Sequence, residues 1–513
     1  MNGADAVLST LADNGVEVCF ANPGTSEMQF VTALDREPRV RPVLGLFEGV
    51  VTGAADGYGR MAGKPAVTLL HLGPGYLNGG ANLHNARRAG TPIVNVIGDH
   101  ATYHRQYDAP LTSDIPALAT PNSRWLKMAE TADQAADLAA EAVKASFGPP
   151  GGSASLILPA DCAWSAASRK GPVLDRPVRA AAPGETVEAV ARRLKGAAKP
   201  VLLLGGTALG ERALRAAGRL NGLGVRVITD TFTARQARGA GRFAPDKMLY
   251  FGEMALTDLA GTDLMVFVET VQPVAFFAYP AAPSVLVPEG CATLTLADRS
   301  QDGALALEQL AEAMGAPAEA ASNDLNLPAL PTGEVNAYTV GASIARHMPD
   351  NAVISDDAVT SGLPVFMQTK GARAHDWLSL TGGAIGQGIP LAVGAAVACP
   401  DRKVLSLNGD GAAMYTVQGL WTLAREALDV TVVIFANHAY RILGIELTRT
   451  EAGKAGPAAA GLLDLGDPRI DWVSLASGLG VPAVRCATAE RFDAALAAAM
   501  GQKGPMLIEA QLA

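Results

Sequence analysis

Short apolar runs alternate with longer segments of helical spacing along almost the whole 513-residue chain. In the first third, apolar runs at 16–21, 43–47 and 66–71 alternate with helical patterns at 4–14 and 49–61. Further runs follow at 201–206, 225–229, 264–269, 292–297, 352–356, 403–411, 430–437 and 505–512. Alternation of this kind is typical of parallel sheets covered by helices on both faces. The sequence therefore predicts an α/β protein.

Two stretches without periodicity divide the chain. Residues 164–184 and 316–334 are rich in Pro and Ala and read as linkers. A chain of this length also exceeds what one hydrophobic core supports. We predict three doubly wound parallel-sheet domains, at 1–165, 185–315 and 335–513, and the lack of a short repeat excludes solenoids and propellers.

The composition limits the kinds of molecule that this protein is expected to bind. A net charge of −9 without a basic run disfavours nucleic acid and anionic membrane surfaces. The amino terminus lacks a basic segment before an apolar one, and the run at 389–398 is shorter than a membrane span. Five scattered cysteines argue against a disulfide framework or zinc knuckle: Cys19, Cys162, Cys291, Cys399 and Cys486. We expect a cytoplasmic protein that acts on small molecules.

An aspartate held between two glycines ends the apolar run at 403–411. Asp410 is followed, one predicted helix (416–426) and one strand later, by Asn437. Neighbouring parallel strands would bring both side chains to the same carboxyl edge, where ligands of open α/β sheets bind. Oxygen ligands of this kind suit Mg²⁺. Gly409 and Gly411 would let a phosphate approach the following helix. A G-D-G alone is equally a plain turn, so the asparagine carries the prediction of a Mg²⁺-bridged diphosphate.

Residues 409–440 resemble the metal and diphosphate motif of thiamine diphosphate-dependent enzymes, in which GDG is followed by an Asn-Asn pair. Here Ala436 replaces the first asparagine of the pair, and Asn437 is the second, which is the ligand in the family. The resemblance implies that Asp410, Asn437 and the backbone carbonyl of Ala439 hold Mg²⁺.

A second region resembles the part of that family that activates the coenzyme. The segment LGLFEGVVTGAADGYGRMAGKPA places Glu48 where the family has the glutamate that acts on the aminopyrimidine ring, ahead of an A-x-D-G-Y-x-R run at 54–60. A carboxylate in that role needs shelter from water. The alternative for Glu48 is an acid that simply favours the start of a helix.

Two further segments resemble benzoylformate decarboxylase-like members. FANPGTSEMQF places Thr25 at a substrate-facing hydroxyl position, and LLHLGPGYLNG places His71 where that subgroup has an active-site histidine. Thr25 could instead be only a helix cap, and His71 only a buried, hydrogen-bonded histidine.

Two loops of the last third match coenzyme contacts. LTGGAIGQGIP resembles the aminopyrimidine loop, with the Gly383 carbonyl as a contact and Ile385 as an apolar wedge, although Ile385 could be only a core residue. SDDAVTSG aligns more loosely with a loop that touches the diphosphate, through Thr360 and Ser361.

The resemblance covers nearly the whole chain and is similar to the branch with acetolactate synthase large subunits and benzoylformate decarboxylase. It implies non-oxidative decarboxylation of a 2-oxo acid through a C2 carbanion and an enamine, which is protonated or joined to a second carbonyl compound. Pro110 and Leu111 stand where the synthases carry Phe-Gln, which favours the decarboxylase. The middle block lacks the extended segment expected for FAD, so FAD is not expected, or at most a vestigial site for it.

The sequence indicates less clearly which residue would donate the proton to the enamine. The second histidine of the benzoylformate enzyme has no counterpart, and aromatic residues stand there instead: Phe276, Phe277 and Tyr279. Helical spacing after Tyr440 would bring Leu443 and Glu446 towards the coenzyme, but Glu446 fits a solvated helix acid equally well. His100 and His104 are further candidates for the pocket wall.

Two alternatives remain beside the 2-oxo acid decarboxylase or carboligase. One is an acetolactate synthase-like condensing enzyme, and the other is a catalytically silent paralogue that serves as a binding or regulatory subunit. Retention of Glu48, Asp410 and Asn437 disfavours the silent paralogue. Because the family builds each site between two chains, the resemblance implies a homodimer or homotetramer.

Overall fold

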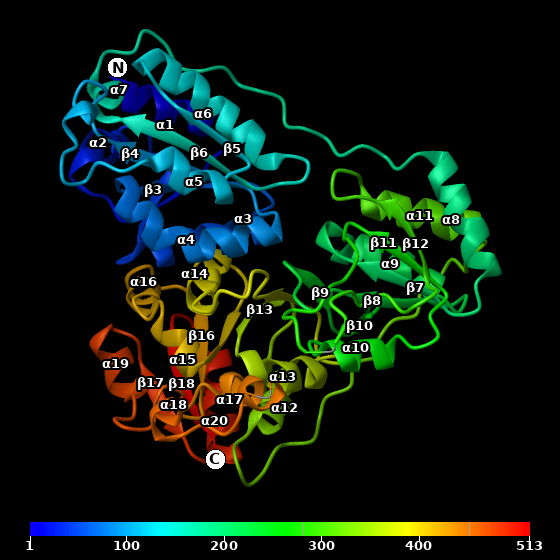
Figure 1. Ribbon diagram of the computed structural model, residues 1–513. Coiled ribbons are helices and arrows are strands. Elements are labelled where there is room, and N and C mark those ends of the chain that lie inside the picture. Colours follow the sequence, from blue (N-terminus) through cyan, green and yellow to red (C-terminus); the bar gives the residue numbers. More distant parts are fainter. Residues whose placement is uncertain (281, 451, 513) are drawn as a thin grey trace.

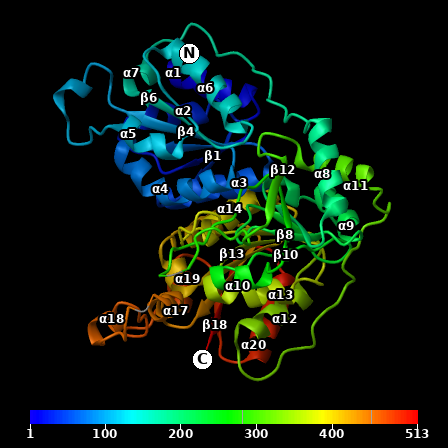
Figure 2. The same cartoon turned by 45° about the vertical axis from the view of Figure 1, so that its right-hand side comes forward.

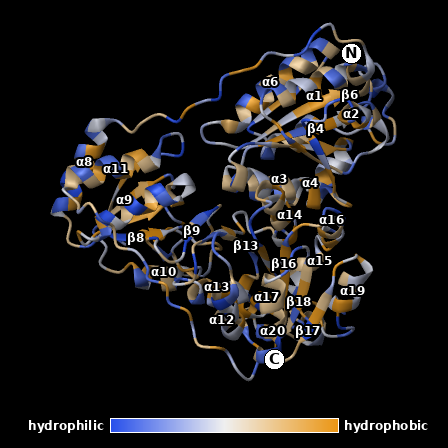
Figure 3. Cartoon of the chain, turned by 180° about the vertical axis from the view of Figure 1, so that it is seen from behind, coloured by the Kyte–Doolittle hydropathy of each residue, from blue (hydrophilic) through white to orange (hydrophobic). Residues whose placement is uncertain are grey.

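The computed structural model describes residues 1–280, 282–450 and 452–512. It contains three sheets in which parallel pairing dominates, each flanked by helices (Figure 1). Many of the strands carry hydrophobic residues, whose apolar side chains are buried (Figure 3). The predicted α/β architecture of three sheets is confirmed.

The first sheet has six parallel strands in the order β2-β1-β3-β4-β6-β5. Its strands are β1 (Val18–Ala21), β2 (Arg41–Leu44), β3 (Ala66–Leu70), β4 (Ile93–Asp99), β5 (Trp125–Met128) and β6 (Ser153–Pro159). Its helices are α1 (Gly3–Asp13), η1 (Thr25–Glu27), α2 (Met28–Leu34), α3 (Glu48–Ala62), α4 (Leu72–Ala89), η2 (Arg105–Tyr107), α5 (Ile115–Ala119), η3 (Thr120–Asn122), α6 (Ala132–Phe147) and α7 (Ala160–Trp164).

The middle sheet has five parallel strands in the order β10-β8-β7-β11-β12. Its strands are β7 (Pro200–Leu204), β8 (Arg226–Thr229), β10 (Asp246–Lys247), β11 (Leu264–Val268) and β12 (Ala292–Ala297). Its helices are α8 (Gly184–Gly196), η4 (Gly206–Leu209), α9 (Glu211–Asn221), α10 (Gly252–Asp258) and α11 (Gly303–Met314).

The third sheet has seven strands in the order β17-β18-β16-β15-β13-β14-β9. Its strands are β9 (Gln236–Arg238), β13 (Ala352–Asp357), β14 (His375–Ser379), β15 (Val404–Gly409), β16 (Val430–Ala436), β17 (Ala483–Cys486) and β18 (Met506–Gln511). Its helices are α12 (Ala337–His347), η5 (Val359–Ser361), α13 (Gly362–Gln368), α14 (Gly388–Ala398), α15 (Asp410–Met414), α16 (Gly419–Arg425), α17 (Arg441–Arg449), α18 (Pro457–Gly461), α19 (Trp472–Gly478) and α20 (Ala489–Met500). Figure 2 shows α17 and α18 reaching outward from this layer.

Strand β9 was not foreseen from the sequence. It comes from the middle third of the chain but pairs antiparallel with β14, so that Arg238 lies opposite His375. The Arg238 guanidinium is buried with its carbon 3.3 Å from the centre of the Phe366 ring. This strand ties the middle third of the chain to the third sheet.

The first and third sheets meet where α3 packs on α14. Glycines allow the two backbones to approach closely, because a Cβ on Gly57 would lie 2.0 Å from the Leu391 carbonyl oxygen. A Cβ on Gly394 would lie 1.8 Å from the Ala54 carbonyl oxygen. A single hydrophobic cluster continues from one domain into the other through this contact. None of the helices in the described residues has the length and apolarity needed to cross a membrane.

Candidate active site

Glu48 is the first residue of α3 and follows Phe47, whose backbone is extended. Its side chain is sheltered, with the residue only 6% exposed, and Asn78 of α4 donates a hydrogen bond of 3.0 Å to Oε2. Gly75 borders the rest of the space around this carboxylate, because a Cβ on Gly75 would lie 3.3 Å from both Glu48 Oε1 and His71 Cβ. The carboxylate therefore lies in a narrow, largely dry space beside His71.

His71 follows β3 and is the N-cap residue of α4, and its ring is held by a carboxylate that the sequence analysis missed. Nδ1 lies 2.9 Å from Oε2 of the buried Glu27, and 3.2 Å from the Ser26 hydroxyl. With Nδ1 engaged in this way, Nε2 is the ring nitrogen open to a substrate. Thr25, the predicted hydroxyl, is exposed at the start of η1.

Glu27 also explains how the loop before η1 is shaped. It accepts a 2.8 Å hydrogen bond from the backbone N–H of Gly24, as an acid in a capping box does. Gly24 in turn packs on the histidine, because a Cβ there would lie 2.2 Å from the His71 ring. The T-S-E pattern could have indicated the cap, but no local pattern predicts a partner 44 residues away.

Asp410 and Asn437 reach the same edge of the third sheet, because β15 and β16 pair in parallel with Gly409 opposite Phe435. Asp410 begins α15 rather than ending the strand, and its carboxylate accepts N–H groups of Gly411 at 2.9 Å and His438 at 2.7 Å. The predicted helix 416–426 is shorter than expected, since α16 spans Gly419–Arg425.

Burial raises the pKa of Asp410, against the effect of those backbone hydrogen bonds. A desolvated carboxylate of this kind is better accommodated beside a cation. Asn437 Oδ1 accepts the Ala439 N–H at 3.0 Å, which folds the backbone after β16. Among the described residues no three His, Cys, Asp or Glu side chains converge. One carboxylate, one amide and backbone carbonyls could act as donors here, and oxygen donors of this kind suit a hard cation.

The predicted aminopyrimidine loop is held by Asp357, which the sequence analysis did not single out. Asp357 Oδ2 accepts the N–H groups of Gly386 at 2.8 Å and Gly388 at 3.1 Å, while Oδ1 is buried without a partner. Burial raises the pKa of Asp357 to about 7. Gly383 has a φ of +75°, which its lack of a side chain permits, and Ile385 is half-buried beside it.

Part of the backbone strain lies beside predicted site residues. Seven non-glycine residues in the described part of the chain have positive φ. Three of them, Leu72 at 47°, Val359 at 50° and His438 at 55°, directly adjoin predicted site residues, namely His71, Thr360 and Asn437. Such conformations cost free energy and persist mainly at functional sites. Thr360 and its buried neighbour Ser361 lie in η5 at the end of β13.

The predicted pocket residues occupy more exposed positions. Pro110 and Leu111 lie in a surface loop that folds back on α4, since a Cβ on Gly73 would lie 2.3 Å from the Ser113 hydroxyl. His104 is exposed, with its ring centre 5.4 Å from that of His100.

Glu446 lies on α17 and is held by a residue of the middle third. The Tyr279 hydroxyl donates a 2.6 Å hydrogen bond to its Oε2, and its Oε1 is buried without a partner. Glu446 is therefore not a freely solvated helix acid. Leu443, on the same helix, is 45% exposed.

The predicted site residues form two groups within one chain. The first contains Glu48 and His71, and the second contains the Asp410 region and the loop around Gly383. Helix α4 contacts both, because its Asn85 exchanges hydrogen bonds of 2.8 and 3.2 Å with the backbone of Ala384. No hydrogen bond joins the two groups directly in the described residues.

Two family models match parts of this chain. Residues 1–119 match the family model "Thiamine pyrophosphate enzyme, N-terminal TPP binding domain", and residues 363–510 match the corresponding C-terminal TPP binding domain. A Mycobacterium tuberculosis protein named "Putative acetolactate synthase large subunit IlvX" is 50% identical, over 99% of this chain and 98% of its own.

Two decarboxylases are more distant relatives. Benzoylformate decarboxylase of Pseudomonas aeruginosa is 28% identical over 97% of this chain and 96% of its own. The structure of a thiamine diphosphate-dependent 4-hydroxybenzoylformate decarboxylase from Rhodococcus jostii superposes with a TM-score of 0.86 at 25% identity, covering 100% of this chain and 99% of that one. The chain belongs to the thiamine diphosphate-dependent enzyme family, in the branch that contains acetolactate synthase and benzoylformate decarboxylase.

Proposed function

We propose that this enzyme is a Mg²⁺-requiring, non-oxidative decarboxylase or carboligase of a 2-oxo acid. The observation that carries the proposal is the Glu27–His71 pair beside Glu48, which combines an oriented imidazole with a sheltered carboxylate. An oriented imidazole can exchange a proton with a reacting group near neutral pH. The relatives named as benzoylformate decarboxylases favour the same reaction class.

The coenzyme and metal would be held by the second group. When bound, thiamine diphosphate supplies the nucleophilic carbon and the electron sink for loss of CO₂. Asp410, Asn437 and the Ala439 carbonyl would hold Mg²⁺, with the diphosphate near Gly409, Gly411, Thr360 and Ser361. The buried, unpartnered oxygens of Asp357 and Asn408 in this region fit a place that a polar group completes.

The remaining proposed site residues each have a distinct role. Glu48 would hold a proton at the aminopyrimidine ring. The Gly383 carbonyl and Ile385 would position that ring. His71 Nε2 would exchange a proton with the substrate, which the Thr25 hydroxyl would also face. Glu446, held by Tyr279, is the second acid we propose for proton delivery. Pro110, Leu111 and Leu443 would form an apolar pocket wall that favours conversion of a carboxylate to CO₂.

The test is CO₂ release from a panel of aliphatic and aryl 2-oxo acids with thiamine diphosphate and Mg²⁺. We expect turnover of at least one acid, and a fall of about 10²–10⁴-fold in kcat for His71→Gln. His347→Gln is the matched control, because His347 is also half-buried and lies 3.0 Å from a carboxylate, Asp493, but outside the site. Bound coenzyme without turnover of any acid would refute the proposal.

An acetolactate synthase-like condensation is the second candidate, favoured by the 50% identical relative. The two candidates differ in the fate of pyruvate. Formation of acetolactate would establish the synthase, whereas release of an aldehyde would establish the decarboxylase.

We further propose a homodimer or homotetramer with each site built by two chains, because Glu48 and Asp410 fall into separate groups within one chain. Mixing the inactive variants Glu48→Gln and Asp410→Ala tests this. Random dimerisation through a two-chain site would restore about a quarter of the parent activity, since half the dimers are mixed and each has one intact site. A site within one chain would give no restoration.

A further inference from the structure

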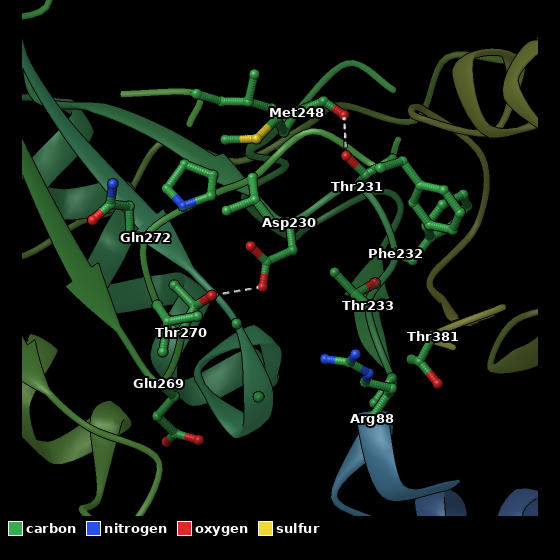
Figure 4. Close-up of a pocket in the computed structure, with 18 of the residues that line it drawn as sticks. Arg88, Asp230, Thr231, Phe232, Thr233, Met248, Glu269, Thr270, Gln272 and Thr381 are labelled. Carbon is green, nitrogen blue, oxygen red and sulfur yellow. Dashed lines mark hydrogen bonds between the residues drawn. The ribbon is translucent and has the colours of Figure 1, made fainter. Parts of the chain in front are cut away.

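The predicted aminopyrimidine loop follows β14 at residues 381–386 and is attached to α4 of the first domain. Its first residue, Thr381, donates a 2.8 Å hydrogen bond from its hydroxyl to the Asn85 carbonyl. Thr381 and Arg88, which lies one turn further along α4, line one cavity together with Asp230 of the middle domain (Figure 4). The loop is therefore held from its start by a helix of another domain.

Every second carbonyl of this loop bonds to a side chain. The three contacts are Gly382 with His84 Nε2 at 3.1 Å, Ala384 with Asn85 Nδ2 at 2.8 Å and Gly386 with the Thr416 hydroxyl at 2.8 Å. The carbonyl of Gly383, between the first two, accepts no hydrogen bond from the described residues. The one carbonyl that the sequence assigns to the coenzyme is thus open to a ligand.

The Asn85 side chain determines the direction of the Gly383 carbonyl. The Gly383 C=O and the Ala384 N–H belong to one planar trans peptide unit, in which the two groups point in opposite directions. The Ala384 N–H donates to Asn85 Oδ1 at 3.2 Å, so the Gly383 C=O is directed away from Asn85. The hydrogen bond from Asn85 Nδ2 to the Ala384 carbonyl fixes the next peptide unit as well.

Asn85 is itself held in place by its neighbours. The residue is 0% exposed, and its Nδ2 also donates to Asn82 Oδ1 at 3.1 Å. The Asn82 amide donates in turn to the Gly49 carbonyl at 2.8 Å. The orientation of the Asn85 amide follows from its partner, because the Ala384 N–H can only donate and so must face the oxygen. A Cβ on Gly382 would lie 2.5 Å from this oxygen, so the glycine permits the close approach.

We propose that Asn85 is a positioning residue for the coenzyme, which acts by directing the Gly383 carbonyl at the amino group of the aminopyrimidine ring. The inference rests on the proposed function, because it uses the coenzyme contact assigned there to Gly383. Without the Asn85 amide, the N–H and C=O of Ala384 would lose their partners. The peptide unit would then be free to turn towards other partners, and the Gly383 carbonyl would no longer be held at the ring.

The test is calorimetric titration, in the presence of Mg²⁺, with thiamine diphosphate and with oxythiamine diphosphate, in which an oxygen substituent replaces the amino group of the ring. The parent should bind thiamine diphosphate about tenfold more tightly, as expected for one hydrogen bond. In Asn85→Ala this preference should shrink to about twofold or less, because the variant and the analogue remove the same contact. Asn85→Ser, which keeps a small polar group, should show an intermediate preference.

Asn95→Ala is the matched control. Asn95 of β4 is also 0% exposed, and its amide makes two hydrogen bonds, with Thr68 at 2.8 Å and Ser155 at 3.0 Å. Both alanine variants leave buried polar groups unpaired, so both should melt at a lower temperature than the parent. Only Asn85→Ala should lose the preference for the amino form of the coenzyme, which separates positioning from a general loss of stability.

Three results would each overturn the inference and leave the proposed function intact: an unchanged preference in Asn85→Ala, an equal loss of preference in Asn95→Ala, or equal affinity of the parent for the two ligands. If the parent bound neither ligand, the coenzyme assignment would fail and the inference would fail with it.

Discussion

Arg60 of α3 joins the first domain to the third, and Arg60→Met tests how much that junction contributes to stability. Its guanidinium donates to both carboxylate oxygens of Asp56, at 2.8 and 2.6 Å, and both side chains are almost fully buried. It also donates to the Ser379 carbonyl at 2.8 Å and the Thr381 hydroxyl at 3.0 Å in the third domain. Methionine keeps much of the length and apolar packing but removes every one of these donors.

The expected loss in the free energy of unfolding follows from the Asp56 carboxylate, which Arg60→Met leaves buried without its cationic partner. Removing one partner of a buried ion pair costs about 3–5 kcal/mol, because the other charge stays buried. Asp56 would retain the Thr91 hydroxyl and the Gln387 amide, each at 2.6 Å, which places the cost near the lower limit. A loss of about 3 kcal/mol in a domain of this size corresponds to a fall of about 6–12 °C in transition temperature.

Differential scanning calorimetry at one fixed scan rate, with the coenzyme present, measures the shift. Arg169→Met is the matched control, because Arg169 also forms a bidentate pair, with Asp137, but on the exposed surface. Surface pairs contribute little, so its transition should coincide with that of the parent. If Arg60→Met and Arg169→Met melted together, the junction would not have the energetic role that its burial implies.

Three further predictions address the site and the cavity. Glu48→Gln should lower kcat about 10²–10⁴-fold, as loss of an acid–base group does, with calorimetric coenzyme affinity retained. Gly24→Ala should displace the His71 ring, 2.2 Å from the added Cβ, and lower kcat/KM by about 10²-fold, whereas Gly80→Ala, where the added Cβ meets open space on α4, should leave activity unchanged. Burial raises the pKa of Asp230 to about 6 from 3.8, so its carboxyl favours the folded state at low pH and loses that contribution as pH rises through about 6. Asp230→Asn should therefore have a higher urea midpoint than the parent near pH 7.5, and little or no advantage near pH 4; an advantage independent of pH would contradict this reasoning.

The sequence predicted the features that depend on strand order alone. Asp410 and Asn437 directly follow consecutive strands, so their arrival at one edge follows once those strands are parallel neighbours. The three-sheet architecture follows from hydrophobic periodicity for the same reason. Local spacing placed Glu48 at the end of a strand, just before a helix at 49–61, whereas Glu48 is the first residue of α3; one or two residues are the usual error in such bounds.

Contacts between distant segments were beyond local patterns. The pairing of His71 with Glu27 depends on how the loop before η1 folds over β3, and the Tyr279–Glu446 hydrogen bond joins residues 167 positions apart. Strand β9 is only three residues long and has no periodicity to detect. These features depend on the angles at which domains pack, which no window of sequence encodes.

Some buried polar atoms have no hydrogen-bond partner, an arrangement that folded chains normally avoid. Oδ1 of Asp357, Oδ1 of Asn408 and Oε1 of Glu446 are all buried and unpaired. Each such atom lowers the free energy of unfolding by about 1–3 kcal/mol, and an apolar substitution would remove this penalty. All three belong to the third domain, as do the left-handed residues Val359 and His438 beside the predicted diphosphate and metal ligands. A sequence optimised only for stability would need none of these groups, so their position in the domain of the predicted diphosphate and metal contacts fits a place that a polar ligand completes.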